Sequence, residues 1–398
     1  MAADERSGCH NTVPAVAARA LSLREYFGMT VFRLGRVLAL AATCHVYAQS
    51  SGAAKLTSGK DIYQAGCAGC HGKDGKGAPQ STIGFEKPDT FPDFTRCDQT
   101  TPEDNWTWKS IIRDGGPSRG FSQIMPSFSG ALTSEQMDAV IGYLRGFCKE
   151  TGWPRGELNL PLALMTEKAF PEDEEVVFGT VNVQGAPGVS SQIVHEQRFG
   201  QNNQIEVAVP VQFVRPRPGL WYGGFGDVGL GLKRVVFSNL HTGSILSLFG
   251  GANFPTGSTT HGLGAGTTTF ETFAAFGQLF PTRTFLQLQG GADLPVDTKK
   301  SPQSVFFRSA LGQEIAQKKG LGRTWSPMVE LVSSRDLVDH AKTNWDVIPE
   351  MQVTLSRRQH VRFGAGLSIP ATNTDGRQKQ LLFYILWDWQ DGRLMEGW

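Results

Sequence analysis

The sequence predicts a protein of two unlike parts: a small all-α domain followed by an antiparallel transmembrane β-barrel of about twelve strands. The run Cys67-Ala68-Gly69-Cys70-His71 lies in a segment whose apolar residues recur at helical spacing. From Glu175 onward cysteines are absent, glycines are frequent, and apolar residues alternate with polar or small ones. At 398 residues the chain is long enough for both parts.

Residues 1–48 are interpreted as an N-terminal extension and an export signal. A basic stretch after Met29 is followed by the apolar residues 37–42 and by Val46-Tyr47-Ala48, whose small last residue suits cleavage. We therefore expect the functional start at Met29. A lipoprotein site at Cys44 is the weaker alternative, because the residue before it matches poorly. No run of roughly eighteen apolar residues occurs, so no transmembrane helix is expected.

The pattern formed by Cys67, Cys70 and His71 is the one by which a c-type haem is attached. The two thiols form thioether bonds to the haem vinyl groups, and the histidine supplies an axial nitrogen to the iron. A zinc site or a redox dithiol is the alternative. A zinc site needs a second pair of ligands nearby, but the next cysteine is Cys97 and no other histidine lies in 52–150. The predicted cofactor is one covalently attached haem c.

A haem that carries electrons needs a second axial ligand, and the methionines of this segment are Met125 and Met137. Met137 shares a helical face with Val140, Ile141 and Leu144, so it is expected in the core. Met125 lies in a loop-like stretch beside a proline, where its thioether can turn inward. Simple packing of Met125 is the alternative.

Residues 55–149 resemble class I cytochrome c. A helix over 58–66 precedes the cysteine motif, and Met125-Pro126 is followed by a terminal helix that ends Tyr143-Leu144-Arg145. The resemblance implies a helical domain, here bounded at 53–150, with His71 and Met125 as the axial ligands. It implies an electron carrier that cycles between ferric and ferrous iron.

Cys97 and Cys148 are the other two cysteines of this domain. In an oxidising compartment a disulfide between them is the economical explanation. Two unrelated thiols are the alternative.

Residues 151–174 are interpreted as a linker that contains prolines and an acidic end. Prolines at 154, 161 and 171 make such a segment extended and stiff. If it instead packs across the barrel mouth, the leucines at 158, 160, 162 and 164 become contacts.

The region 175–398 is predicted to form the barrel. Its twelve candidate strands are interpreted over 175–185, 190–200, 203–214, 224–238, 243–254, 266–280, 283–294, 303–316, 323–334, 345–356, 360–370 and 377–390. Short turns alternate with longer loops, the latter including 215–221, as is typical of outer-membrane barrels. An even number of strands places both ends of the barrel on one side, which we expect to be the periplasm.

The last candidate strand carries Leu381, Phe383, Ile385 and Trp387 on one face, a band suited to lipid. A soluble β-sandwich or a secreted barrel is the alternative. The stretch 222–233 and the Phe254-Pro255-Thr256-Gly257 run resemble the outer-membrane barrel family of meta-pathway phenol degradation. That resemblance implies uptake of apolar compounds.

Seven charged residues are expected to face the barrel interior. They are Asp227, Lys233, Arg308, Glu314, Glu330, Glu350 and Arg362. One interpretation is a charged lumen that selects a solute. The other, slightly preferred, is a network of paired charges that plugs the lumen and stabilises the barrel.

These features predict a haem-binding electron-transfer protein of the outer membrane, whose cytochrome domain lies in the periplasm. Its expected partners are periplasmic electron carriers or oxidoreductases, an extracellular redox partner being a further option, together with outer-membrane lipid. The alternative is an outer-membrane channel for small, aromatic solutes with an accessory cytochrome domain. The net charge of +1 and the absence of basic runs argue against nucleic acid. No nucleophile–base pair stands out, so we do not expect an enzyme.

Overall fold

The computed structural model describes residues 56–184, 187–217, 219–316 and 324–398. The predicted export signal lies outside these residues. Within them, the helical domain has five α-helices and two short 3-10 helices. The α-helices are α1 Gly59–Gly66, α2 Ala68–His71, α3 Cys97–Thr100, α4 Asn105–Asp114 and α5 Ser134–Arg145; the 3-10 helices are η1 Gln80–Thr82 and η2 Gly116–Arg119. No helix in the described part of the chain is long and apolar enough to cross a membrane.

The three longer helices begin at side chains that bind free backbone N–H groups. Ser58 accepts from the N–H of Asp61 at the start of α1, and Asp104 accepts from the N–H of Thr107 at the start of α4. At α5, Thr133 and Gln136 form a reciprocal capping box. The buried stripe of α5 is Met137, Val140, Ile141 and Leu144, which confirms Met137 as a core residue.

Helices α1 and α5 cross at Gly59. A Cβ added there would lie 1.9 Å from the carbonyl oxygen of Ala139. Only glycine allows the two backbones to approach this closely. The crossing packs Ile62 and Tyr63 of α1 into one core cluster with the buried face of α5.

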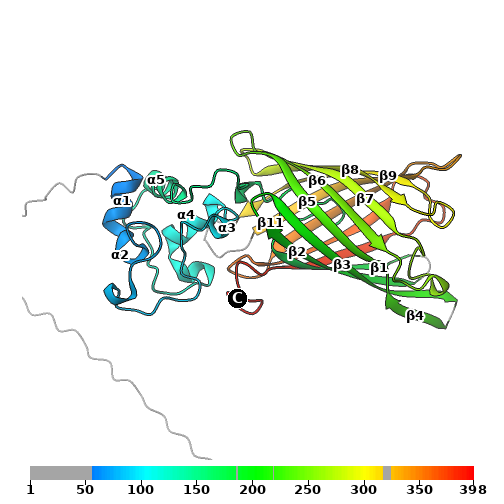
Figure 1. Ribbon diagram of the computed structural model, residues 1–398, viewed down its shortest axis with the longest axis horizontal. Helices are drawn as coiled ribbons and strands as arrows, with labels where there is room; N and C mark the ends of the chain where they lie inside the picture. Colours follow the sequence, from blue (N-terminus) through cyan, green and yellow to red (C-terminus); the bar gives the residue numbers. More distant parts are fainter. Residues whose placement is uncertain (1–55, 185–186, 218, 317–323) are drawn as a thin grey trace, which may run out of the picture. The chain divides into compact units, whose positions relative to one another are not determined.

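The barrel is a closed antiparallel sheet (Figure 1). Its strands are β1 Glu174–Asn182, β2 Gly188–Phe199, β3 Asn203–Arg217, β4 Leu220–Phe225, β5 Val228–Asn239, β6 Ser244–Phe254, β7 Thr269–Leu279, β8 Thr284–Pro295, β9 Ser304–Gln313, β10 Ile315–Ala316, β11 Thr324–Asp336, β12 Asn344–Thr354, β13 Val361–Pro370 and β14 Gln380–Asp388. Both β4 and β5 pair with β3, and both β9 and β10 pair with β11, so the wall has twelve strand positions. Pairing of β1 with β14 completes the ring. The predicted number of strands is confirmed.

Both ends of the barrel lie at one rim. Glu174, the first residue of β1, pairs with Asp388, the last residue of β14. The turns at this rim are short, as at 200–202 and 240–243. The opposite rim carries the longer connections 255–268, 296–303 and 371–379. We call the rim with the short turns the turn rim and the rim with the longer connections the loop rim.

The prediction of a loop over 215–221 is wrong. Strand β3 continues to Arg217 and pairs with β4 from Leu220 onward. The prolines at 216 and 218 suggested a loop. However, among the described residues β2 pairs with β3 only as far as Val214. Beyond it β3 has no described partner on that edge, where a proline costs no ladder hydrogen bond.

The two faces of the barrel wall differ in polarity. Exposed outward side chains are predominantly apolar, among them Leu230, Leu232, Leu248, Leu311, Val329 and Ile385. Inward positions one residue away carry Lys233, Glu330, Glu350, Gln287 and Gln289, all buried. This alternation, apolar outside and polar inside, is the pattern of a barrel whose outer surface meets lipid.

A segment of the chain occupies the barrel interior. We call residues 158–173 the lumen strap. Its leucines Leu158, Leu160, Leu162 and Leu164 are all buried. Leu162 and Leu164 pack in a cluster with Tyr384 and Leu386, whereas Leu158 packs with Phe249 and Phe273. The residues interpreted as a linker over 151–174 are therefore largely a part of the barrel core.

The barrel wall binds the lumen strap chiefly through the strap backbone. Glu330 accepts from the N–H groups of Met165 (3.0 Å) and Thr166 (2.7 Å) and from the Thr166 hydroxyl (2.6 Å). Further N–H groups are bound by Gln204, Gln289, Glu350 and Gln352, and carbonyl groups by Lys233, Ser247, Gln287, Arg308 and Tyr384. These side chains come from β3, β5, β6, β8, β9, β11, β12 and β14.

Four of the seven charged residues expected to face the interior contact the lumen strap. They are Lys233, Arg308, Glu330 and Glu350. Asp227 instead binds the loop N–H groups of Gly257 and Ala265, and Glu314 pairs with Arg283. The seventh, Arg362, donates to the carbonyl of Gln359 at 3.1 Å, in the turn before its own strand. The arrangement is closer to the plugging network than to a solute-selecting lining. The charged side chains that contact the strap bind its backbone groups more than they bind side chains of opposite charge.

Candidate haem-binding site

The cysteine motif forms one turn of helix. Cys67 follows α1, and Ala68–His71 is the short helix α2. The N–H of His71 donates to the Cys67 carbonyl at 2.9 Å. Residues three and four positions apart lie on the same face of such a turn. Cys67, Cys70 and His71 therefore share a face.

Tyr63 anchors this turn. Its hydroxyl donates to the carbonyl of Gly72 at 2.6 Å and lies 3.2 Å from the carbonyl of His71. The ring is fully buried, and burial raises the pKa of Tyr63 above its ordinary value. The hydroxyl therefore remains a proton donor to the backbone carbonyls of His71 and Gly72.

The His71 ring lies among aromatic side chains. Its centroid is 5.1 Å from that of Phe91 and 5.2 Å from that of Phe94. Burial lowers the pKa of His71 to about 4, so the imidazole is neutral at neutral pH. Neutral imidazole is the form that binds a metal. Its Nδ1 atom is buried and has no hydrogen-bond partner within the described residues. A neutral, half-buried imidazole with an unpaired, buried Nδ1 fits a haem-iron ligand.

The two motif thiols differ in exposure. Cys70 is exposed, whereas Cys67 is partly buried and packs against the domain core. Burial, with a smaller effect of Cys70, raises the pKa of Cys67 to about 11. Within the described residues, no group of three or more His, Cys, Asp or Glu side chains is arranged to hold a metal ion. The structure thus offers no further protein ligands for the zinc alternative there.

The Met125 loop is tied to the end of α4. The N–H of Gly116 donates to the Met125 carbonyl at 3.0 Å, and the N–H of Phe128 donates to the Ile112 carbonyl at 3.0 Å. A Cβ on Gly116 would lie 2.3 Å from the carbonyl oxygen of Ser122, so the loop needs glycine there. The sequence analysis did not identify this glycine.

The structure brings the motif and Met125 to one core. Met125, Cys67 and Phe94 all pack against the cluster that contains Tyr63 and Ile112. Met137, by contrast, is a buried member of that cluster. Met125 is therefore the half-buried methionine packed against this core, and its role as a ligand stays a prediction.

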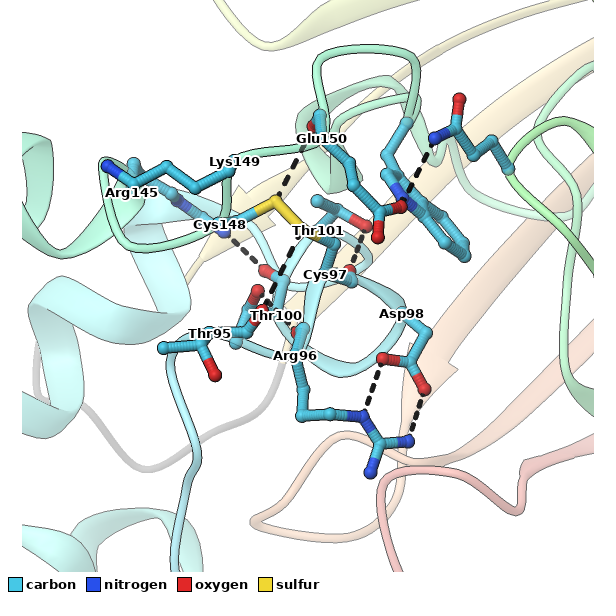
Figure 2. The surroundings of a disulfide bond; sticks show 12 residues. Thr95, Arg96, Cys97, Asp98, Thr100, Thr101, Arg145, Cys148, Lys149 and Glu150 are labelled. Carbon is cyan, nitrogen blue, oxygen red and sulfur yellow. Dashed lines mark hydrogen bonds and ion pairs between the residues drawn. A yellow bond between two sulfur atoms is a disulfide. The ribbon is translucent and has the colours of Figure 1, made fainter. Parts of the chain in front are cut away.

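A disulfide joins Cys97, the first residue of α3, to Cys148, which follows α5 (Figure 2). The Cα atoms are 5.1 Å apart. The predicted pairing is confirmed. The closed segment of 51 residues contains Met125, so the bridge restricts the chain that carries the candidate ligand.

Comparison with known families supports this assignment. Residues 54–144 match the family model described as cytochrome c oxidase, cbb3-type, subunit III. Residues 54–144 are a cytochrome c domain. Such a domain implies haem. The family match covers a minority of the chain. No curated protein matches the chain.

Solved structures similar to this chain are outer-membrane barrels. The NanC porin is 8% identical, with a TM-score of 0.39, and covers 54% of this chain and 98% of its own. The KdgM porin in complex with disordered oligogalacturonate is 7% identical, with a TM-score of 0.37 and coverages of 54% and 98%. An outer membrane channel from Pseudomonas putida F1 is 14% identical, with a TM-score of 0.36 and coverages of 55% and 96%. The resemblance to the phenol-degradation barrel family stays a prediction.

Proposed function

We propose that the cytochrome domain carries electrons by means of one haem attached covalently to Cys67 and Cys70. His71 and Met125 are the axial ligands in this proposal. The observation that carries it is the half-buried His71, whose Nδ1 has no hydrogen-bond partner among the described residues, on the same helical turn as both thiols. When bound, the haem supplies a one-electron couple between ferric and ferrous iron.

The residues around the haem have separate tasks. Tyr63 holds the backbone beside His71, and Phe91 and Phe94 exclude water from the imidazole. Gly116 holds the Met125 carbonyl, and the N–H of Phe128, three residues later, holds the loop to the carbonyl of Ile112. A thioether ligand raises the reduction potential relative to a second histidine. The domain therefore suits electron exchange rather than oxygen activation.

Optical spectra of the purified protein test the ligand set. We expect a c-type spectrum with the weak far-red band of methionine–iron ligation in the oxidised state. Met125→Ala should abolish that band and lower the potential, while Met137→Leu should retain it. A wild-type spectrum without the band, or a band that survives in Met125→Ala, would refute Met125 as a ligand.

We also propose that the barrel is embedded in the outer membrane, with its turn rim and the cytochrome domain on the periplasmic side. The support is the apolar outer face and the meeting of both barrel ends at the turn rim. The proposed partners are periplasmic electron carriers. Protease added to intact cells should leave the haem domain uncut, whereas protease added after opening the outer membrane should release it.

A solute channel is the competing function. The lumen strap fills the interior near the turn rim, where its backbone replaces water as the partner of wall side chains. We therefore expect conductance in planar bilayers far below that of an open barrel. A large, stable conductance for the intact protein would favour the channel over the anchoring role.

A further inference from the structure

The His71 ring lacks the hydrogen bond that usually orients a metal-binding histidine. Such a histidine almost always donates the N–H of its second ring nitrogen to a carbonyl, a carboxylate or a water. That bond fixes the plane of the ring and makes the imidazole a stronger electron donor. The Nδ1 atom of His71 is buried and has no hydrogen-bond partner among the described residues. The orientation of this ring must therefore come from contacts of another kind.

Two phenylalanine rings supply such contacts. The Phe91 ring is stacked on the imidazole, with 5.1 Å between the ring centroids and 22° between the ring planes. The Phe94 ring lies 5.2 Å from the imidazole and is tilted by 45°. Aromatic rings at such separations attract each other beyond the simple burial of area. The two contacts limit rotation of the His71 ring without any hydrogen bond.

The Phe91 ring is held by the segment that follows the cysteine motif. The N–H of Gly77 donates to the His71 carbonyl at 2.8 Å, so this segment folds back on the motif. Gly77 has a φ of +87°, and a Cβ there would lie 3.0 Å from Cε1 of Phe91 and 3.1 Å from Nζ of Lys87. The Lys87 Nζ lies 5.4 Å from the Phe91 ring centroid, which is a cation–π contact. The missing side chain at Gly77 thus allows Phe91 and Lys87 to approach the motif.

The Phe94 ring is held by different contacts. Its backbone N–H donates to the carbonyl of Gly75 at 2.9 Å. Its ring meets that of Trp108 edge to face, with 5.5 Å between the centroids and 62° between the planes. Phe94 also packs against the core of the helical domain. Both phenylalanine rings therefore have contacts of their own that fix them beside the imidazole.

We propose that Phe91 is a positioning residue for His71: its stacked ring, assisted by Phe94, sets the plane of the axial imidazole in place of a hydrogen bond at Nδ1. This inference rests on the proposed function, because it concerns the ligand of a bound haem. An imidazole without that hydrogen bond donates less electron density to ferric iron. The ferrous form is then favoured, and the reduction potential is raised.

Electron paramagnetic resonance of the ferric, full-length protein measures the orientation of the ring, because the g-values of a low-spin haem depend on the plane of the axial imidazole. We expect a single narrow set of g-values for the unsubstituted protein. Phe91→Leu keeps an apolar side chain but removes the flat ring, so it should broaden or split that set. Phe91→Tyr retains the ring and should retain the spectrum. Phe85→Leu is the control, because the Phe85 ring lies 6.5 Å from that of Phe91 and its loss leaves the stack on His71 in place.

A potentiometric titration of the same variants measures the consequence for electron transfer. Phe91→Leu should lower the reduction potential, because water that reaches Nδ1 would supply the hydrogen bond that is missing. Phe91→Tyr and Phe85→Leu should leave the potential unchanged. If Phe91→Leu has the g-values and the potential of the unsubstituted protein, the inference is wrong.

A third measurement needs no substitution, so it holds even if Phe91→Leu fails to fold. The Nδ1–H proton is observed by NMR in the ferrous protein labelled with nitrogen-15 at histidine. We expect the upfield position of an N–H that makes no hydrogen bond. A downfield position would show that a carbonyl or a water orients the ring, and it would overturn the inference.

Haem staining on a denaturing gel and the far-red methionine–iron band are recorded for each protein. If the unsubstituted protein holds no covalent haem, the proposed function and this inference both fall. If it holds haem and shows the band but fails the resonance tests, only the inference falls.

Discussion

The helical domain forms its predicted haem-attachment motif from residues close in sequence, whereas the barrel forms its interior from residues far apart in sequence. Cys67, Cys70 and His71 occupy one helical turn. The lumen strap, by contrast, meets Gln204, Ser247, Glu330 and Tyr384, which lie on four different strands. The first site depends on side-chain identity at fixed spacing. The second depends on closure of the barrel, because the wall binds mainly backbone groups that any residue carries.

The largest expected effect concerns the four described cysteines. The double variant Cys67→Ser, Cys70→Ser should lose all covalently bound haem, because the motif then has no thiol for a thioether bond. Haem staining of a denaturing gel measures this. The matched variant Cys97→Ser, Cys148→Ser should keep the stain, because in the unsubstituted protein these two cysteines form a disulfide with each other. Equal staining of both double variants would show that the motif is not the attachment site.

That same Cys97→Ser, Cys148→Ser variant should destabilise the helical domain. Loss of a cross-link that closes 51 residues lowers the free energy of unfolding by about 4 kcal/mol in the chain-entropy account. Denaturant unfolding followed at the haem Soret band, in the absence of reductant, measures the change. The spectrum of the barrel strands in the far ultraviolet should hardly differ. An unchanged unfolding midpoint would contradict the role of the bridge.

A smaller effect is expected at the crossing of α1 and α5. Gly59→Ala should destabilise the helical domain by about 2 kcal/mol, because its Cβ meets the Ala139 carbonyl at 1.9 Å. Gly142→Ala in α5 is the control, since a Cβ there has no atom within 4 Å. It should be neutral or stabilising by up to about 1 kcal/mol. Equal effects of the two substitutions would mean that the helices do not cross at Gly59.

The smallest expected effect is in the barrel, at the contact between Glu330 and the lumen strap. Glu330→Gln keeps the shape of the side chain but replaces an acceptor oxygen with an amino group that faces the strap N–H groups. We expect strap binding to weaken by about 1.5 kcal/mol, and hydrogen exchange at Met165 and Thr166 to accelerate about tenfold. Glu314→Gln, which alters an ion pair with Arg283 and no hydrogen bond to Met165 or Thr166, serves as control. Unchanged exchange in Glu330→Gln would show that this carboxylate does not hold the strap.

Much of the helical domain could be predicted because its determinants are local. The spacing of Met137, Val140, Ile141 and Leu144 identified a buried helical face, and it distinguished Met137 from Met125. The two glycines at which backbones meet, Gly59 and Gly116, could not be identified in the same way. Glycine is required at these two positions because the carbonyl oxygens of Ala139 and Ser122 lie close to them. Only the packed structure brings these residues near.

The barrel strands could also be predicted, because alternation of polarity is itself a local pattern. The extent of β3 and β4 was missed, since prolines usually mark loops and the free edge of β3 is a tertiary property. The role of residues 158–173 was left between two interpretations. Their leucines and prolines are compatible with either a spacer or a packed segment until the wall residues that bind them are known.

The sequence by itself predicted the haem-attachment motif and Met125, rather than Met137, as a ligand, and it determined the number of strands and the rim at which the barrel begins and ends. Each of these follows from spacing along one segment or from counting segments. Only the tertiary structure decided that the lumen strap lies inside the barrel and that Glu330 holds Met165 and Thr166. Nearly every residue carries the same backbone N–H and carbonyl groups, so no sequence pattern predicts which side chains will bind them. Closure of the barrel determines which wall side chains lie within hydrogen-bond distance of the strap backbone.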